Sequence, residues 1–192
     1  MPNKILEGEF VKLRPLEISD AQLTYSWRSS SRSRFLNAGA QTIPDQELWI
    51  KLRPSDEYNF IIELKSGVPV GMVSLTAIDK INRRAEPGRF LIGDENLVRG
   101  LPIAVEAMKL IYELAFNELG LLRLYGTVAA DNLLMTKWQK YLGMREEGRL
   151  RKHLYLNNEF QDAICLGLLV NEYKKITIHR MNALIFAAKK PS

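Results

Sequence analysis

The fold is decided by the stretch Asn82-Arg83-Arg84-Ala85-Glu86-Pro87-Gly88-Arg89-Phe90-Leu91-Ile92-Gly93. Its residues from Arg84 to Ile92 predict a β-strand, and turn residues follow before a helical pattern begins at Ile103. A strand, a glycine-containing loop and a helix N-terminus aim unpaired N–H groups and a positive dipole at one point, which suits a pyrophosphate. The pattern is equally typical of an ordinary strand-to-helix connection, so the motif alone leaves both interpretations open.

The helix that starts at Ile103 is expected to follow Pro102, which suits a first turn, and to end at Gly120. Its expected apolar face contains Ile103, Ala104, Ala107, Met108, Ile111, Leu114 and Ala115. Its expected polar face contains Glu106, Lys109, Glu113 and Asn117. Arg99 and Gly100 add a cation and an unobstructed backbone to the loop before it.

Length and composition bound the class of protein. With 192 residues, 46% of them hydrophobic, the chain is long enough for one domain with a substantial core. The formal charge of +5 is spread among residues of both signs, without a dedicated basic arm. This distribution suits steering of small anions at least as well as nucleic-acid binding, and no nucleic-acid partner is expected.

The use of cysteine and of apolar residues bears on the compartment. Cys165 is the only cysteine, which excludes an internal disulfide and fits a reducing compartment. No apolar stretch approaches the ~20 residues that span a bilayer, and the residues after Met1 lack the apolar core of a signal peptide. A cytoplasmic location without a membrane partner is therefore expected. Two histidines and one cysteine make no metal-ligand cluster, so no metal is expected.

The order of predicted elements is strand, two helices, three strands, helix, strand, helix and closing strands. The predicted strands are 11–16, 59–64, 68–78, 84–92, 122–128 and 160–170, and predicted helices begin near Ser19, Pro44, Ile103 and Asn132. That order predicts a mixed α+β sheet and not a doubly wound one.

Six blocks between Leu13 and Val170 stand in a characteristic order. They are Leu13-Arg14-Pro15-Leu16 with Ser19-Asp20; Val70 to Leu75; Asn82 to Gly93; Ala115 to Leu121; Asn132 to Met144; and Arg145 to Arg151 with Asp162 and Gly167 to Leu169. Together they resemble the GNAT superfamily of acyl-CoA-dependent N-acetyltransferases. The resemblance implies an α+β fold with a mixed, mostly antiparallel central sheet flanked by helices and splayed between the fourth and fifth strands. It implies a domain at 1–170 and an extension at 171–192 that packs on the domain or on the partner subunit of a homodimer.

Within that family, the N-terminal part narrows the acceptor. Trp27-Arg28, followed after five residues by Arg34-Phe35-Leu36, resembles bacterial members that acetylate a nucleotide-linked amino sugar. The run Asn82 to Glu86 is similar to those enzymes and to polyamine and ribosomal-protein acetyltransferases. A nucleotide-linked amino sugar is therefore favoured as the small-molecule amine, and a polyamine comes next. A protein N-terminus, or a non-catalytic acyl-CoA-binding module, is the alternative.

Acetyl transfer to an amine needs a base, a polarised carbonyl and a departing thiolate. The resemblance assigns the base to Glu86, with a strand-edge ion pair to Arg83 or Arg84 as the alternative interpretation. Backbone N–H groups of Leu91 or Ile92 are the expected donors to the carbonyl. Gln139 stands where the family commonly carries an acidic tyrosine. Because glutamine is a poor acid, thiolate release is expected to use Tyr141 or water, or to need no acid.

The resemblance also implies the binding residues. Acetyl-CoA is the expected co-substrate, with its phosphates on the amides of Leu97, Val98, Arg99, Gly100, Leu101, Pro102 and Ile103. The flanking Leu97 and Pro102 depart from the family's phosphate-loop pattern, and proline lacks an N–H donor. Further coenzyme contacts are expected from Asn132, which is also a helix cap, and from Lys137 and Lys140, which otherwise form a solvated face. The expected acceptor residues are Trp27, Arg28, Arg34, Trp49, His153 and Tyr155, with core packing as the alternative for the two tryptophans.

Overall fold

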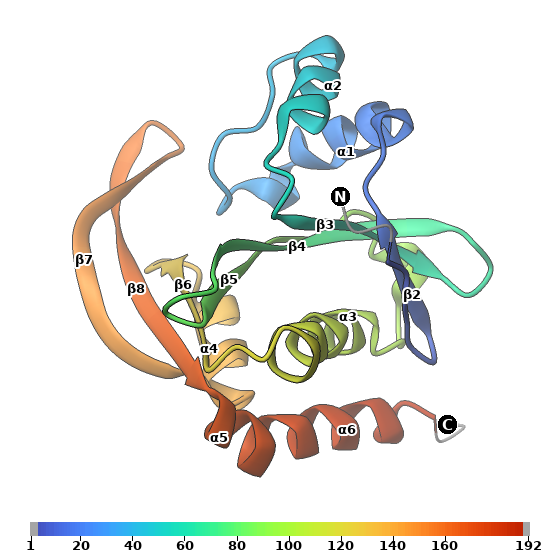
Figure 1. Ribbon diagram of the computed structural model, residues 1–192. Coiled ribbons are helices and arrows are strands. Elements are labelled where there is room, and N and C mark those ends of the chain that lie inside the picture. The colour runs from blue at the N-terminus through green and yellow to red at the C-terminus, as the bar shows by residue number, and fades with distance from the viewer. Residues whose placement is uncertain (1–3, 190–192) are drawn as a thin grey trace.

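A computed structural model describes residues 4–189 and shows one eight-stranded sheet between layers of helices (Figure 1). The strands are β1 (Leu6–Glu7), β2 (Val11–Pro15), β3 (Tyr58–Leu64), β4 (Pro69–Asp79), β5 (Arg84–Ile92), β6 (Arg123–Ala129), β7 (Arg145–Leu156) and β8 (Glu159–Leu169). Their order is β1-β2-β3-β4-β5-β6-β8-β7, and only β5 and β6 are parallel neighbours. The predicted mixed, mostly antiparallel α+β sheet is confirmed.

Helices cover both faces of the sheet (Figure 1). The α-helices are α1 (Ala21–Arg28), α2 (Ile43–Leu52), α3 (Ile103–Glu113), α4 (Leu133–Tyr141), α5 (Val170–Glu172) and α6 (Ile178–Ala187). Short 3-10 turns are η1 (Ile18–Asp20), η2 (Ser31–Ser33) and η3 (Asn96–Val98), and π-turns are η4 (Leu114–Glu118) and η5 (Tyr173–Thr177). Helices α1 and α2 lie on one face, and α3 lies on the other with α6 beneath it.

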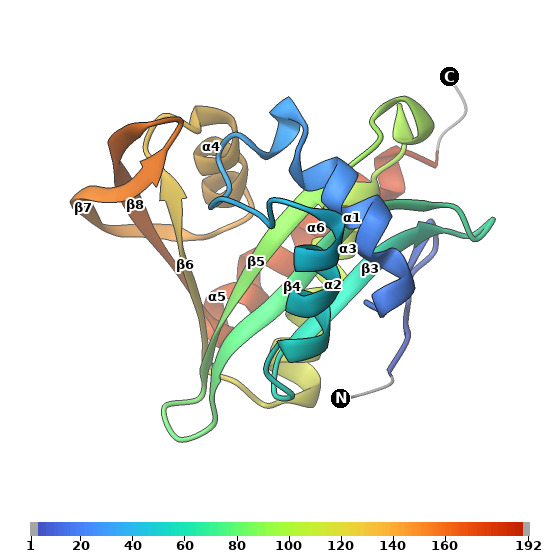
Figure 2. The ribbon, with the colours of Figure 1, turned by 90° about the horizontal axis from the view of Figure 1, so that it is seen from above.

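The sheet opens between β5 and β6. These strands pair only at Arg84 with Arg123 and at Ala85 with Leu124, and beyond that point they diverge. Figure 2 shows the two halves of the sheet separating from this junction like the arms of a V. The predicted splay is therefore present, and it leaves one edge of β5 without a neighbouring strand.

A β-bulge reshapes β5 beside this opening. The register with β4 changes from Met72 opposite Leu91 to Ser74 opposite Gly88, which leaves one extra residue in β5. Arg89 has a positive φ of 49° in this irregular segment. Because bulges re-aim the side chains around them, simple alternation does not predict which side chains of 86–90 face the opening.

Two hydrophobic cores hold the layers together. The larger lies between the sheet, α3 and α6, and the smaller joins Trp27, Ile50, Met72 and other apolar residues under α1 and α2. A buried strand between two such cores reads as a continuous apolar run, which explains the pattern of β4. At the end of β5, a side chain on Gly93 would overlap the indole of Trp27, so the smaller core needs glycine at that position.

Helix α3 departs from the sequence prediction in two respects. Its last part widens into the π-turn η4, in which Leu119 donates its N–H to the Leu114 carbonyl at 2.9 Å. Glu106 was predicted on the exposed face but is only 4% exposed. Its carboxylate accepts N–H groups from Glu9, Phe10 and Val11 at 2.7–2.8 Å. Three charge-assisted hydrogen bonds compensate for burying the carboxylate, so the predicted polar face is wrong at this position.

The chain after β8 is helical. Tyr173 and Met181 are buried in the larger core, and α6 packs on α3. Of the predicted extension at 171–192, residues 190–192 lie outside the described part. The short strand β1 was not predicted, because two residues carry too little periodicity to be recognised. Within residues 4–189, no helix is long and apolar enough to cross a membrane.

Candidate active site

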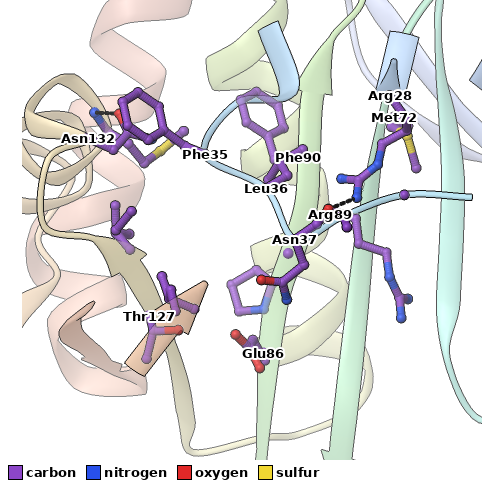
Figure 3. A pocket seen from close by; sticks show the side chains of 18 of the residues that line it. Arg28, Phe35, Leu36, Asn37, Met72, Glu86, Arg89, Phe90, Thr127 and Asn132 are labelled. Carbon is purple, nitrogen blue, oxygen red and sulfur yellow. Dashed lines mark hydrogen bonds between the residues drawn. The ribbon is translucent and has the colours of Figure 1, made fainter. Parts of the chain in front are cut away.

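A cavity of about 430 Å³ lies at the opening between β5 and β6. Its walls come from the loop 35–40, from residues 86–90 of β5, from 127–129 of β6, and from Asn132, Met135 and Gln139 at α4. Arg28, Gln46, Trp49, Met72, Met108 and Leu154 complete the lining. Figure 3 shows Glu86 between the β6 wall and the α1 side of this space.

Glu86 is the carboxylate in this lining. Burial raises its pKa, while a hydrogen bond from the Thr127 backbone and the charge of Arg89 lower it by less. The alternative ion pair is absent: Arg83 donates to the Gly120 carbonyl, and Arg84 pairs with Asp79 at 3.5 Å. A partly buried carboxylate with a raised pKa in a cavity is a suitable proton acceptor near neutral pH.

Arg89 lies beside Glu86 on the bulge and was not predicted as a site residue. Its guanidinium donates to Glu57 at 2.6 Å and to the Asn59 side chain at 2.9 Å. It also lies 5.2 Å from the centre of the Trp49 ring. These contacts fix Arg89 in the cavity wall. The only sequence signal was its place three residues after Glu86, and regular alternation would have put the two on opposite faces.

The segment from α1 to α2 passes over the cavity and is tied down at both sides. Arg28, at the end of α1, donates to the Asn37 carbonyl (Figure 3). Arg32 donates from Nε to the Ile92 carbonyl at 2.6 Å and reaches Glu95 at 2.5 Å. These bonds connect the loop to the end of β5 and position residues 35–40 against the site.

Helix α4 supplies the opposite wall. Asn132 caps it, accepting the Met135 N–H at 3.2 Å, and also lines the cavity. Gln139 lines the cavity too, and its Oε1 accepts a hydrogen bond from the Tyr112 hydroxyl at 3.1 Å. Burial raises the pKa of Tyr112, so this hydroxyl stays protonated as a donor. The bond fixes the Gln139 carboxamide. Its Nε2 also donates to the Met135 sulfur at 3.8 Å, a weak acceptor, which leaves one N–H as a free donor.

Tyr141 does not line the cavity. It is 51% exposed and its ring lies 5.3 Å from the Arg180 guanidinium. Met135 and Gln139, one turn apart, share the cavity face of α4, whereas Tyr141 follows Gln139 by two residues and lies about 200° further round the helix. The prediction of Tyr141 as an acid is therefore corrected. Phe90 of β5 stacks on Trp138 with ring centres 5.8 Å apart, which joins β5 to α4 across the opening.

The loop before α3 offers fewer amides than predicted. Asp94 accepts the N–H of Leu97, Glu95 accepts that of Val98, and Val98 accepts that of Leu101. The first helical N–H bond runs from Glu106 to Pro102, so the N–H groups of Ile103, Ala104 and Val105 have no partner within the helix. These three donors lie at the N-terminal end of α3, close in sequence to Gly100, whose φ is 79°, and to the exposed Arg99.

The two predicted carbonyl donors differ in direction. Gly93 donates its N–H to the Val70 carbonyl at 2.8 Å, in register with Met72 opposite Leu91. Since antiparallel N–H groups alternate in direction, the Leu91 N–H faces β4 and the Ile92 N–H faces the open edge. Both side chains are buried away from the cavity lining, which excludes them as side-chain contacts.

Several predicted binding side chains lie elsewhere. Trp27 is a core residue, the exposed Arg34 lies over Phe35, and the Tyr155 ring packs against that of Phe160 at a tilt of 56°. His153 is exposed on β7 and Lys137 is exposed on α4, and neither lines the cavity. Lys140 pairs with Glu146 at 2.5 Å. Of the predicted acceptor residues, Arg28 and Trp49 do line the cavity.

The described residues offer no group of three or more His, Cys, Asp or Glu side chains able to hold a metal ion. The cavity brings together one carboxylate of raised pKa, a carboxamide donor, two guanidinium groups and an open strand edge. These groups suit a proton transfer beside a polarised carbonyl.

Comparisons with known proteins agree with this geometry. Residues 11–145 match the family model described as an acetyltransferase (GNAT) domain. Spermidine N(1)-acetyltransferase of Escherichia coli is 29% identical over 167 residues, covering 85% of this chain and 88% of that protein. YdaF of Bacillus subtilis, provisionally assigned as a ribosomal N-acetyltransferase, is 32% identical over 111 residues, or 58% of this chain and 59% of its own. A GCN5-related N-acetyltransferase from Brucella melitensis superposes with a TM-score of 0.80 at 24% identity, covering 96% of this chain and 86% of that one.

Proposed function

The chain belongs to the GNAT family of acyl-CoA-dependent N-acetyltransferases, and on that premise we propose that it acetylates the primary amine of a small molecule with Glu86 as the base. The observation that carries this proposal is the partly buried Glu86 carboxylate, whose pKa is raised by burial, at the point where β5 and β6 separate. A nucleotide-linked amino sugar is the favoured acceptor, and a polyamine is second.

Acetyl-CoA supplies the thioester whose acetyl group is transferred. Its phosphates would bind at the start of α3, where the N–H groups of Ile103, Ala104 and Val105 are unpaired within the helix and can donate to phosphate oxygens. Gly100 leaves the approach open, because a Cβ there would meet no atom within 4 Å. Arg99 adds a cation, and Asn132 borders the cavity near its α4 wall.

Glu86 accepts a proton from the acceptor ammonium or from the attacking amine, directly or through a water molecule. The amine nitrogen then forms a bond to the carbonyl carbon, and the carbon–sulfur bond breaks. Ile92 has an N–H directed to the open edge of β5, which supports its role as a donor to the carbonyl oxygen. The Leu91 N–H faces β4 and is therefore not available to the carbonyl oxygen.

Gln139 donates a hydrogen bond to the departing thiolate in this proposal, and solvent supplies the proton. A side-chain acid is unnecessary because a thiol has a pKa of about 8.5, so its thiolate is a stable leaving group. The Tyr112 hydroxyl holds the Gln139 carbonyl at 3.1 Å, one amide N–H donates to the Met135 sulfur at 3.8 Å, and the other is available to the thiolate.

The test combines calorimetric titration of acetyl-CoA with an assay of free thiol release over a panel of amines. The panel contains a nucleotide-linked amino sugar, spermidine and a peptide with a free N-terminus. We expect binding and turnover of at least one small amine. Failure to bind acetyl-CoA contradicts the proposal, and binding without turnover identifies a non-catalytic acyl-CoA module. Turnover of the peptide alone identifies a protein N-terminal acetyltransferase. A cytoplasmic location and a homodimer stay predictions.

A further inference from the structure

Two arginine side chains lie at the same end of the cavity, on the side opposite Asn132 (Figure 3). Arg28 ends α1 and Arg89 stands on the bulge of β5. They are close enough that the charge of Arg89 lowers the pKa of Arg28, although burial of Arg28 lowers it more. Arg89 also acts on Glu86. This end of the cavity therefore carries two cationic side chains.

The two arginines differ in how their charges are balanced. Arg89 has a counterion, because Glu57 accepts its hydrogen bond at 2.6 Å. Arg28 forms no ion pair with any residue in 4–189, and its hydrogen-bond partner is the neutral Asn37 carbonyl. A guanidinium carries five N–H donors, so most donors of Arg28 are free for a further partner at the cavity wall.

Keeping an unpaired cation partly buried beside a second cation is unfavourable, because both desolvation and like-charge repulsion oppose it. An anionic group placed in the cavity would remove both effects. Guanidinium groups bind carboxylate and phosphate oxygens through paired hydrogen bonds, which gives geometric specificity as well as energy.

We infer that the acceptor carries an oxyanion, a phosphate or a carboxylate, that binds Arg28 while its amine lies at Glu86. This inference rests on the proposed function and narrows its acceptor to amines that are also anions. Arg28 holds the oxyanion, Arg89 adds positive potential, and Asn37 orients Arg28 through its carbonyl.

A polyamine fits this end of the cavity poorly. Spermidine carries further ammonium groups besides the one that reacts, and these would meet the charges of Arg28 and Arg89 with only Glu86 in the lining to balance them. The Escherichia coli relative is named for spermidine, but its 29% identity over 167 residues does not establish the same acceptor for this chain.

The kinetic test uses pairs of amines that differ only by the anion. Glucosamine 6-phosphate is compared with glucosamine, and 4-aminobutyrate with 4-aminobutanol, in the thiol-release assay. We expect the anionic member of one pair to have a kcat/KM at least about tenfold higher, and that pair identifies the oxyanion. Arg28→Gln should remove this preference, because it should lower kcat/KM for the anionic amine about tenfold more than for the uncharged one. Arg28→Lys keeps the positive charge but cannot form the paired hydrogen bonds of a guanidinium, so it should lose most of the preference for the anionic amine.

The control is Arg151→Gln, which removes an exposed arginine of β7 outside the cavity lining and should keep the preference. Equal kcat/KM values for both members of both pairs, or a preference for spermidine, would overturn the inference. An unchanged preference in Arg28→Gln would also overturn it.

If none of these amines is acetylated, that result counts against the proposed function. A binding measurement still tests the oxyanion site in that case. Inorganic phosphate at constant ionic strength should raise the melting temperature of the wild type and of Arg151→Gln by the same amount. The increase should be smaller in Arg28→Gln and in Arg28→Lys. Equal increases in all four proteins, or no increase in the wild type, would contradict an oxyanion site at Arg28.

Discussion

Replacing Glu106 by alanine should strongly destabilise the protein, because this carboxylate joins the start of α3 to the turn between β1 and β2. It accepts the N–H groups of Glu9, Phe10 and Val11 at 2.7, 2.7 and 2.8 Å, and it is 4% exposed. Hydrogen bonds to a charged group contribute about 1.5–3 kcal/mol each. Loss of the lower value three times gives a decrease of about 4.5 kcal/mol in the free energy of unfolding.

Glutamine at position 106 should cost about half as much. Phe10 and Val11 both donate to Oε2, so an amide oxygen placed there keeps two neutral bonds. The amide nitrogen would face the N–H of Glu9, which loses its acceptor. A decrease of about 2 kcal/mol is therefore expected for Glu106→Gln.

Urea unfolding followed by circular dichroism measures both values. The matched control is Glu113→Ala on the same helix, whose partly exposed pair with Lys109 at 3.6 Å should contribute less than about 0.5 kcal/mol. The reasoning is refuted if Glu106→Ala costs less than about 1 kcal/mol or no more than Glu113→Ala. Either result would mean that the three bonds do not hold α3 against β2.

Two further predictions concern the coenzyme and thiolate sides of the site. Gly100→Ala places a side chain at a φ of 79°, which strains the loop by about 1 kcal/mol. This variant should raise the KM for acetyl-CoA more than the KM for the amine. Equal effects on both KM values would count against a phosphate site there. Gln139→Leu leaves the buried Tyr112 hydroxyl without an acceptor and should lower the free energy of unfolding by about 1–3 kcal/mol, whereas Tyr112→Phe should cost less. Gln139→Leu should also lower kcat, and an unchanged kcat in steady-state assays would remove its role toward the thiolate.

The strand at the centre of the site could be predicted from sequence, but its detailed shape could not. Arg84 to Ile92 has the bounds predicted for it, because the strand ends on the apolar run Phe90-Leu91-Ile92 and the turn residues Asn82 and Gly93 bracket it. The bulge at Arg89 depends on register with β4 and has no signature in a single strand. The sequence therefore did not predict Arg89 as a cavity residue, although Arg89 lies within the strand that was predicted.

Polar residues show where periodicity stops being informative. Glu106 was assigned to an exposed face because charged residues usually are exposed. Its partners are backbone N–H groups 95 to 97 residues earlier, and only the folded chain brings them together. Of the residues predicted for the acceptor, Arg28 and Trp49 line the cavity and Arg34 and Tyr155 do not, since the direction of loop and edge-strand side chains depends on tertiary packing.

The role of Glu86 as the base is tested most directly by the pH dependence of kcat/KM for the wild type and for Glu86→Gln, measured with one good acceptor. Burial raises the pKa of Glu86, and its base form exists only above that pKa. The wild-type rate should therefore fall on the acid side at a pH above the ordinary glutamate pKa of about 4.3. Glu86→Gln should be at least about 100-fold slower and should lack this acid limb. A Glu86→Gln enzyme with the wild-type rate, or with the same acid limb, would contradict the account.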